Sequence, residues 1–162
     1  MGVLYNSVGI SAKKSARIPW QGIWENNSGI IFLMSGINMT LPELKTMIAD
    51  YMENGFLENI IDMFKHDRTL YPLIGELMTD ERVRVRLGMS ALMETLKEED
   101  PENIYSALPN ILPLLKHNEP VIRGDAAYLL GIIGHEESIP LLEKTANNDT
   151  NKEVRLSNYL HF

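Results

Sequence analysis

The sequence predicts an all-α fold, an α-solenoid (α-α superhelix) of about four stacked helical pairs. A β-branched residue followed by arginine recurs at the equivalent place of three segments, as Val85-Arg86, Ile122-Arg123 and Val154-Arg155. The two spacings are 122 − 85 = 37 residues and 154 − 122 = 32 residues. A phrase that recurs with a period in the thirties is typical of helical pairs that stack into a solenoid.

The residues around each pair repeat with the period of a helix. Apolar residues follow the first pair at positions 85, 89, 92, 93 and 96, which share one helical face, and the same offsets from Ile122 are apolar again. A proline opens a short apolar run about thirteen residues before each pair, at Pro72, Pro109 and Pro140. We therefore expect three helix–turn–helix repeats, at residues 69–107, 108–138 and 139–162.

The first 38 residues differ from the repeats. They are rich in Gly, Ser and Asn and show no sustained helical period. We expect an irregular or disordered leader over residues 1–38: a disordered tail, a tag-like remnant, translated sequence upstream of the natural start, or a docking peptide. A signal peptide is not expected, because the apolar run from Gly29 to Met34 is short and no cleavage site follows it.

Residues 39–68 predict an atypical helical cap at the start of the solenoid. Thr40-Leu41-Pro42-Glu43 has the form of a capping box with proline in the first turn. Two amphipathic segments follow, and Gly55 separates them. A non-repeating helical pair before regular repeats is typical of a terminal cap.

The last repeat has an incomplete apolar stripe. A shift of 32 residues places Asn158 at the position of Ala126 and His161 at the position of Leu129. Either the last helix is short and frayed, or this end of the solenoid packs on another surface, such as a second copy in a homodimer. The residues favour neither alternative.

The repeated pairs predict how neighbouring units stack. Each β-branched residue belongs to the apolar face, and the arginine after it is expected to reach a carboxylate or a helix-end carbonyl of a neighbouring unit. Asp80 and Asp149 each lie five residues before such a pair, so they are the expected partners. The stacking residues are therefore Val85, Arg86, Ile122, Arg123, Val154, Arg155, Asp80 and Asp149; anion binding by the arginines is the alternative.

The segment from Asn118 to Gly134 resembles the second helix of a HEAT-like repeat. It is most similar to the short type found in phycobilin-lyase-like HEAT proteins, and the resemblance covers roughly residues 70–157. It implies a superhelix of helical pairs. The family includes scaffolds, adaptors and a few enzymes, so the resemblance implies more about fold than about function.

Composition limits the partners and the compartment. Residues 39–162 carry 12 basic and 21 acidic residues, a net charge of 12 − 21 = −9. An acidic solenoid disfavours contact with a nucleic-acid backbone. No segment has the roughly 18 apolar residues of a membrane span. The sequence contains no cysteine, which fits a cytoplasmic location.

The enzyme hypotheses depend on the resemblance. Some HEAT-like enzymes, such as deoxyhypusine hydroxylases, bind two irons through several His-Glu pairs, whereas this sequence has one, His135-Glu136, directly after a helix-ending glycine. His66, His117 and His161 show no ligand spacing. We expect no catalytic, cofactor-binding or metal-binding residues; the alternative is a HEAT-like enzyme or enzyme component, such as a bilin lyase or a metal-dependent hydroxylase.

The sequence therefore favours a non-catalytic protein–protein interaction module, an adaptor or scaffold subunit. Positions beside the core stripe of the second helices that differ between units are available for a partner. Tyr128 is the expected aromatic anchor, although packing between helices is the other interpretation of this residue. The partner-binding candidates are Arg84, Leu87, Ala91, Val121, Tyr128 and Ile132. The acidic outer faces would favour a protein partner with a basic surface.

Overall fold

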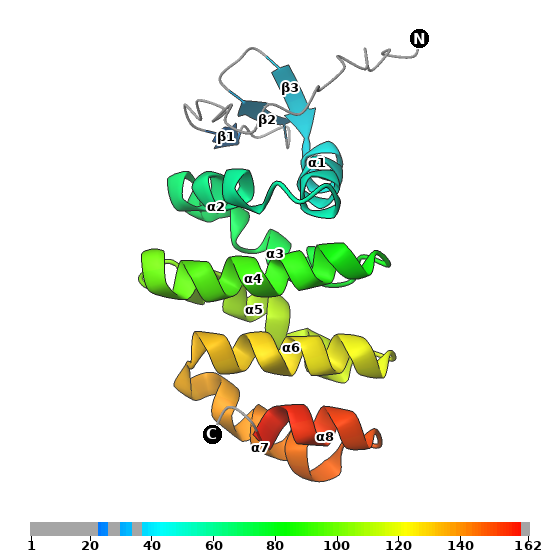
Figure 1. The fold of residues 1–162 in the computed structure, drawn as a ribbon. Helices are drawn as coiled ribbons and strands as arrows, with labels where there is room; N and C mark the ends of the chain where they lie inside the picture. The colour runs from blue at the N-terminus through cyan, green and yellow to red at the C-terminus, as the bar shows by residue number, and fades with distance from the viewer. Residues whose placement is uncertain (1–22, 26–29, 34–36, 160–162) are drawn as a thin grey trace.

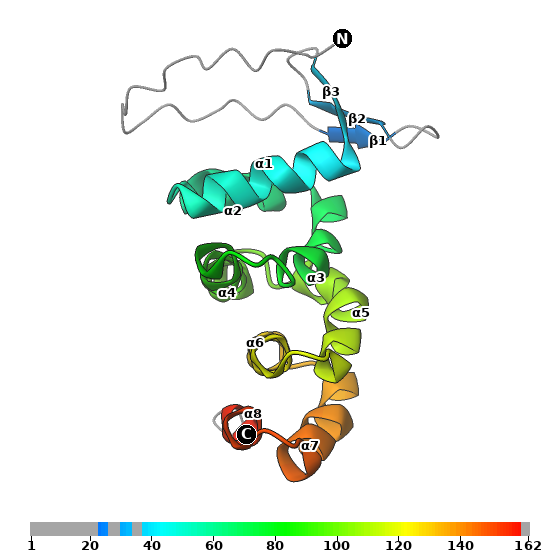
Figure 2. The same cartoon turned by 90° about the vertical axis from the view of Figure 1, so that its right-hand side faces the viewer.

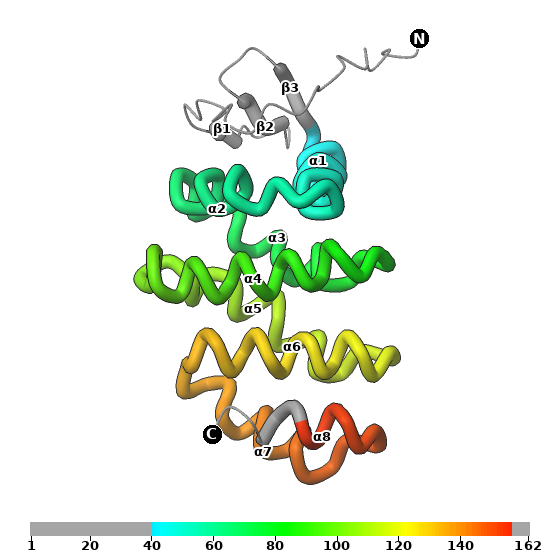
Figure 3. The backbone as a smooth tube through the Cα atoms, viewed as in Figure 1, coloured from blue at the N-terminus to red at the C-terminus, as the bar shows by residue number. Residues whose placement is uncertain are grey.

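The computed structural model describes residues 23–25, 30–33 and 37–159, with side chains for residues 40–156. The described helices form the predicted α-solenoid: four helical pairs lie one above another, as Figures 1 and 3 show. The pairs are α1 with α2, α3 with α4, α5 with α6, and α7 with α8. Their bounds are Leu41–Glu53, Leu57–His66, Leu73–Leu77, Val83–Glu99, Leu108–Ile111, Pro120–Ile133, Ile139–Asn148 and Lys152–Tyr159.

Short 3₁₀ helices complete the first helix of each repeat. They are η1 (Arg68–Leu70), η2 (Ile104–Ala107), η3 (Leu112–Lys116) and η4 (Glu136–Ser138). Because η2 leads directly into α5 and η4 into α7, the second and third repeats begin near residues 104 and 136, earlier than the expected 108 and 139. Pro109 and Pro140 lie in the first turn of α5 and α7, after the 3₁₀ turn rather than at the start of the unit.

A small sheet precedes the helices. Strands β1 (Ile23–Glu25), β2 (Ile30–Leu33) and β3 (Ile37–Thr40) pair antiparallel in the order β1-β2-β3, with Trp24 opposite Phe32. The expectation of an irregular leader over residues 1–38 does not hold for these segments, whose backbones are extended and hydrogen-bonded to one another. Each strand is too short to give a recognisable alternating pattern in the sequence. The rest of the leader lies outside the described residues.

The first helix, α1, is oriented differently from the helices of the later pairs. In Figure 1, α1 is seen end-on while α4 and α6 lie across the view, and Figure 2 shows the opposite, so α1 runs crosswise to them. At the start of α1, the Glu43 carboxylate accepts hydrogen bonds from the Thr40 backbone N–H and hydroxyl, both at 2.8 Å. Gly55 follows the helix with a left-handed φ of 82°, a conformation that glycine adopts without strain.

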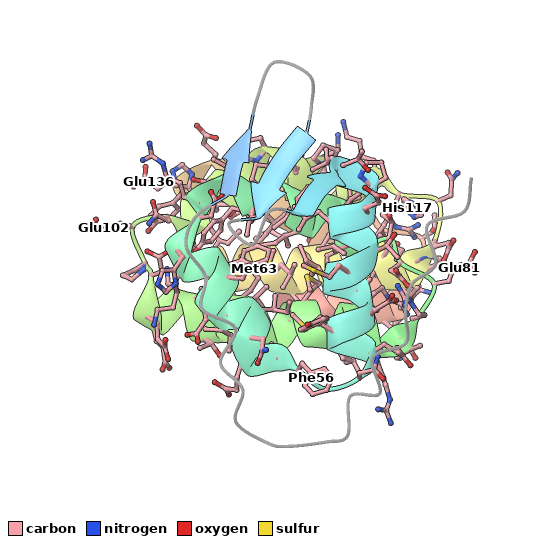
Figure 4. All side chains as sticks on the ribbon, turned by 90° about the horizontal axis from the view of Figure 1, so that it is seen from above. Phe56, Met63, Glu81, Glu102, His117 and Glu136 are labelled. Atoms are coloured by element: carbon pink, nitrogen blue, oxygen red, sulfur yellow. The ribbon has the colours of Figure 1, made fainter. Side chains whose placement is uncertain are left out.

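The later pairs form two rows, which Figure 2 shows side by side. We call α4, α6 and α8 the second-helix row, and α3, α5–η3 and α7 the first-helix row. One hydrophobic core runs from α1 to α7 and includes residues with no exposed surface, such as Phe64, Met89, Leu92 and Leu129. Figure 4, viewed along the stack, places Met63 near its centre and Glu81, Glu102 and Glu136 at its periphery.

Candidate partner-binding surface

The three arginines of the repeated phrase make the same contact within their own unit. Each donates a hydrogen bond from Nη1 to the backbone carbonyl six residues earlier, in the turn that precedes its helix. The three bonds are Arg86 to the Asp80 oxygen at 2.9 Å, Arg123 to the His117 oxygen at 2.8 Å, and Arg155 to the Asp149 oxygen at 2.6 Å. The β-branched residues beside them, Val85, Ile122 and Val154, are at most 3% exposed. The phrase therefore combines a core residue with an arginine that closes the inter-helix turn.

Two of the arginines also reach a carboxylate of the next unit. Arg123 binds Asp149 with two parallel bonds, Nε to Oδ2 at 2.7 Å and Nη2 to Oδ1 at 2.8 Å. Arg86 makes one longer bond, from Nε to Asp125 Oδ2 at 3.2 Å. Both contacts join opposite charges, and a pair with two parallel bonds is stronger than a pair with one bond. Both arginines therefore connect consecutive units of the second-helix row.

The structure assigns the carboxylate partners differently from the sequence-based expectation. Asp149 lies against Arg123, as expected, but Asp80 binds Arg82, whose Nε and Nη2 each donate at 2.9 Å. Arg82 also donates to Asp50 of α1 at 2.7 Å, which connects the cap to the first repeat. The carboxylate opposite Arg86 is Asp125. The repeat pattern could not reveal it, because the equivalent positions are 125 − 37 = 88 and 125 + 32 = 157, a glycine and a serine.

The number of hydrogen bonds separates the electrostatics of the two inter-unit pairs. The hydrogen bonds from Arg123 hold the pKa of the Asp149 carboxyl below its usual value. Desolvation instead raises the pKa of Asp125, and the single bond from Arg86 opposes this only in part. The pair between Arg123 and Asp149 is therefore the better-compensated contact.

The partner-binding candidates lie on the second-helix row but differ in exposure. Leu87 is 64% exposed and Val121 is 48% exposed, and Arg84 is also exposed. Ala91, Tyr128 and Ile132 are half-buried. Two further apolar residues of the row, Val83 and Leu156, are 58% and 52% exposed but are not among the candidates. Val83 precedes the repeated pair and lies off the apolar core stripe, so the repeat pattern gives no signal for it.

Tyr128 connects two units of the row. Its hydroxyl donates a hydrogen bond to a carboxylate oxygen of Glu94 on α4, which raises the pKa of Tyr128. Its ring packs partly against the core. The structure therefore gives this residue an inter-helix contact, while the residue as a whole stays half-buried.

Exposed apolar side chains surround a hollow between α4 and α6. The hollow has a volume of about 140 Å³, and its lining includes Val83, Leu87 and Val121. The inter-unit pair of Arg86 with Asp125 also lines it, with the two charges paired to each other. On α6 itself, Arg123 and Asp125 are the charged residues, and each forms an ion pair with a neighbouring unit. The central part of the row therefore presents an apolar, charge-compensated surface.

The histidine considered as a metal ligand caps a 3₁₀ helix. His135 Nδ1 accepts a hydrogen bond from the Glu137 N–H at 3.3 Å, and the imidazole lies 5.3 Å from the Tyr105 ring. Among the residues that the structure describes, no group of three or more His, Cys, Asp or Glu side chains could hold a metal ion. Within that same part of the chain, no helix combines the length and apolar character needed to cross a membrane.

Comparison with known proteins matches the repeat region. The family described as HEAT repeats matches residues 71–158, which is 158 − 71 + 1 = 88 of the 162 residues. The match begins just before α3 and leaves out the first pair, α1 and α2. It does not distinguish the phycobilin-lyase-like type from other HEAT repeats. No curated protein and no solved structure matches the chain. With its stacked helical pairs and the arginines that connect them, this chain belongs to the HEAT repeat family.

Proposed function

We propose that this protein is a non-catalytic interaction module, an adaptor or scaffold subunit, and that the second-helix row holds an apolar segment of a protein partner. The observation that carries the proposal is that each helix of this row exposes a large apolar side chain: Leu87 on α4, Val121 on α6 and Leu156 on α8. Stacked helical repeats commonly present such rows as extended binding surfaces.

The central helix of the row supports the same proposal. The charges of α6 are engaged within the protein, so an apolar partner segment could cover this helix without separating an ion from its counterion. Glu94 and Glu98 are exposed on α4 at the margin of the surface. A partner with basic residues beside its apolar segment would complement these carboxylates and associate faster.

The test is affinity capture from an extract of the natural host, with three versions of the protein. They are the wild type, a Leu87→Ser and Val121→Ser double variant, and an Ile139→Ser control on the first-helix row, where Ile139 is 42% exposed. We expect a stoichiometric protein that the wild type and the control retain and the double variant loses. Circular dichroism should show equal helix content in all three.

Two results would contradict the proposal. Equal capture by the double variant would place the binding surface elsewhere. A coloured or metal-loaded protein without a partner would favour the alternative of a HEAT-like enzyme or enzyme component. An absorption scan and a metal analysis of the same eluate detect this second result.

Tyr128 gives a finer test of the same surface. A Tyr128→Phe variant removes the hydrogen bond to Glu94 but keeps the ring. We expect it to retain the captured protein while its melting temperature falls slightly, whereas Leu87→Ala should weaken capture with little change in melting. Loss of capture in Tyr128→Phe alone would assign the hydroxyl to the partner instead.

The remaining parts of the proposal concern location and assembly. The absence of cysteine supports a reducing compartment such as the cytoplasm. Association of two copies through the last helical pair stays a prediction, which analytical ultracentrifugation measures directly: a mass of twice 18.4 kDa would support it.

A further inference from the structure

A second apolar hollow lies in the first-helix row, between η3 and α7. It has a volume of about 570 Å³, within the range of pockets that bind ligands or side chains of partners. Leu112 and Pro113 contribute apolar surface from η3, and Leu141 contributes it from α7. The hollow is open on one side, so it is a groove rather than an enclosed cavity. We call it the η3–α7 groove.

Two lysines line this groove, one from each element. Lys116 ends η3 and Lys144 lies in the middle of α7, and both side chains are exposed. The carboxylate that also lines the groove belongs to Asp149, and Arg123 occupies it at 2.7 Å. Neither lysine has a carboxylate within ion-pair distance among the described side chains.

These lysines are unusual within an acidic protein. Most of the other basic residues of the solenoid bind a carboxylate or a backbone carbonyl; they are Lys45, Lys65, Arg82, Arg86, Lys97, Arg123 and Arg155. Acidic residues outnumber basic ones in residues 39–162 by 21 to 12. Two uncompensated positive charges beside one apolar groove therefore form a local exception to the charge of the molecule.

We propose that the η3–α7 groove binds an acidic amphipathic segment of a protein partner. Apolar side chains of the segment would cover Leu112, Pro113 and Leu141, and its carboxylates would pair with Lys116 and Lys144. A basic segment would meet two like charges at the same place. The open groove suits a peptide segment, whose backbone stays in water, better than a free lipid chain, which gains most from complete enclosure.

This site goes beyond the function proposed above. It lies on the other row of the solenoid, and it selects the opposite charge: acidic here, basic on the second-helix row. A protein with both surfaces can hold two different partners at once. The two proposals fail independently, because substitutions on one row leave the other row unchanged.

The test is a peptide-display selection from a random library against the full chain, followed by binding measurements with the enriched peptides. The decisive variant is Lys116→Glu with Lys144→Glu. The matched control is Arg84→Glu with Lys152→Glu, which makes the same change in net charge at two exposed basic residues of the second-helix row. Equal melting temperatures of the two double variants establish that both are folded.

We expect the selection to enrich peptides that combine leucine or aromatic residues with Asp or Glu. Fluorescence anisotropy should show that the groove variant binds these peptides at least about tenfold more weakly, while the control binds them within about twofold of the wild type. Raising the ionic strength from about 0.05 to 0.5 M should also weaken binding, because the lysines are exposed to solvent.

Three results would overturn the proposal. The first is a selection that returns no acidic peptides. The second is a groove variant that binds acidic peptides as tightly as the wild type does. The third is loss of these peptides by the Arg84 and Lys152 variant alone. A separate measurement uses dodecanoate, a free fatty acid, as the probe. If dodecanoate binds at the groove and displaces the selected peptides at micromolar concentration, the groove is a lipid site and not a peptide site.

Discussion

Two junctions between successive repeats share the same sequence pattern but differ in which of the two helical rows is closely packed. In the upper junction, where α3 meets α5, a Cβ added to Gly75 would lie 2.4 Å from the Asn110 carbonyl oxygen, so the two backbones are in direct contact. In the lower junction, between η3 and α7, the groove lies open. Leu112 stands 112 − 75 = 37 residues after Gly75, at the equivalent position, and its side chain lines the groove.

In the second-helix row the order is reversed, because there the lower junction has the tighter contact. The upper junction has the single Arg86–Asp125 bond at 3.2 Å, with the Asp125 side chain 33% exposed. The lower junction has the two-bonded pair of Arg123 with Asp149, whose side chain is 6% exposed. The comparison teaches that the repeat specifies the order and register of the units, while single residues that do not repeat decide which side of each junction is tight.

The largest expected effect is on the free energy of unfolding when Arg123 or Arg86 is replaced by alanine. Arg123→Ala leaves the Asp149 carboxylate nearly buried without its counterion, so we expect a loss of about 3 kcal/mol in the free energy of unfolding. Arg86→Ala removes a weaker bond to a more exposed partner and should cost about 1–2 kcal/mol. Urea denaturation followed by circular dichroism measures both. Equal losses would show that the two junctions do not differ in this row.

A methyl group at Gly75 tests the tight side of the upper junction. Gly75→Ala should lower the free energy of unfolding by about 1–3 kcal/mol, because the added atom meets backbone that cannot move aside alone.

Gly88→Ala is its matched control. The added Cβ there would lie 2.7 Å from the Met52 sulfur, at a flexible side chain that can shift, and alanine favours the helix by up to about 1 kcal/mol. We therefore expect Gly88→Ala to be close to neutral. A neutral Gly75→Ala would mean that α3 and α5 can separate without cost.

The smallest expected effect is in the pH dependence. The folded pKa of Asp149 lies below its unfolded value, so its contribution to stability is complete above about pH 4 and is lost as the pH falls through the folded pKa. The stability difference between wild type and Asp149→Asn should therefore shrink on acidification.

Asp125 should show the opposite sign. Burial raises its folded pKa, so the ionised carboxylate costs stability at neutral pH, and this cost disappears as the pH falls through the raised pKa. As the pH falls from neutral to about 4, the free energy of unfolding of the wild type should rise relative to that of the Asp125→Asn variant. Thermal melts at several pH values measure both differences; parallel curves for the two variants would contradict the contrast between the junctions.

The fold was readable from the sequence because its signals are local and repeated. The buried residues at 85, 89, 92, 93 and 96 mark one helical face, and the same offsets from Ile122 mark the next. The cap does not repeat, but its signals are also local: a capping box at its start and a glycine between its two helices. Asp149 could be proposed as an arginine partner because an aspartate stands five residues before both Val85 and Val154.

The candidate surface was readable only in part. Leu87 and Val121 lie exposed on the predicted row, but Val83 was missed because it lies outside the repeated phrase. Tyr128 could be placed on the row, yet its hydrogen bond to Glu94 spans 128 − 94 = 34 residues and has no counterpart pattern in the sequence. The pairing of the three short strands was missed because each has too few residues to show an alternating period.

The sequence therefore determines the helices, their order and the spacing of the units, because the apolar period, the capping residues and the prolines act over a few residues. The distances between units arise only in the folded stack. Gly75 allows contact with Asn110, Leu112 borders an open groove, and Asp125 meets Arg86 because residues far apart in the chain come together there. Packing between layers depends on side-chain volume and charge at single positions, and no local period encodes it.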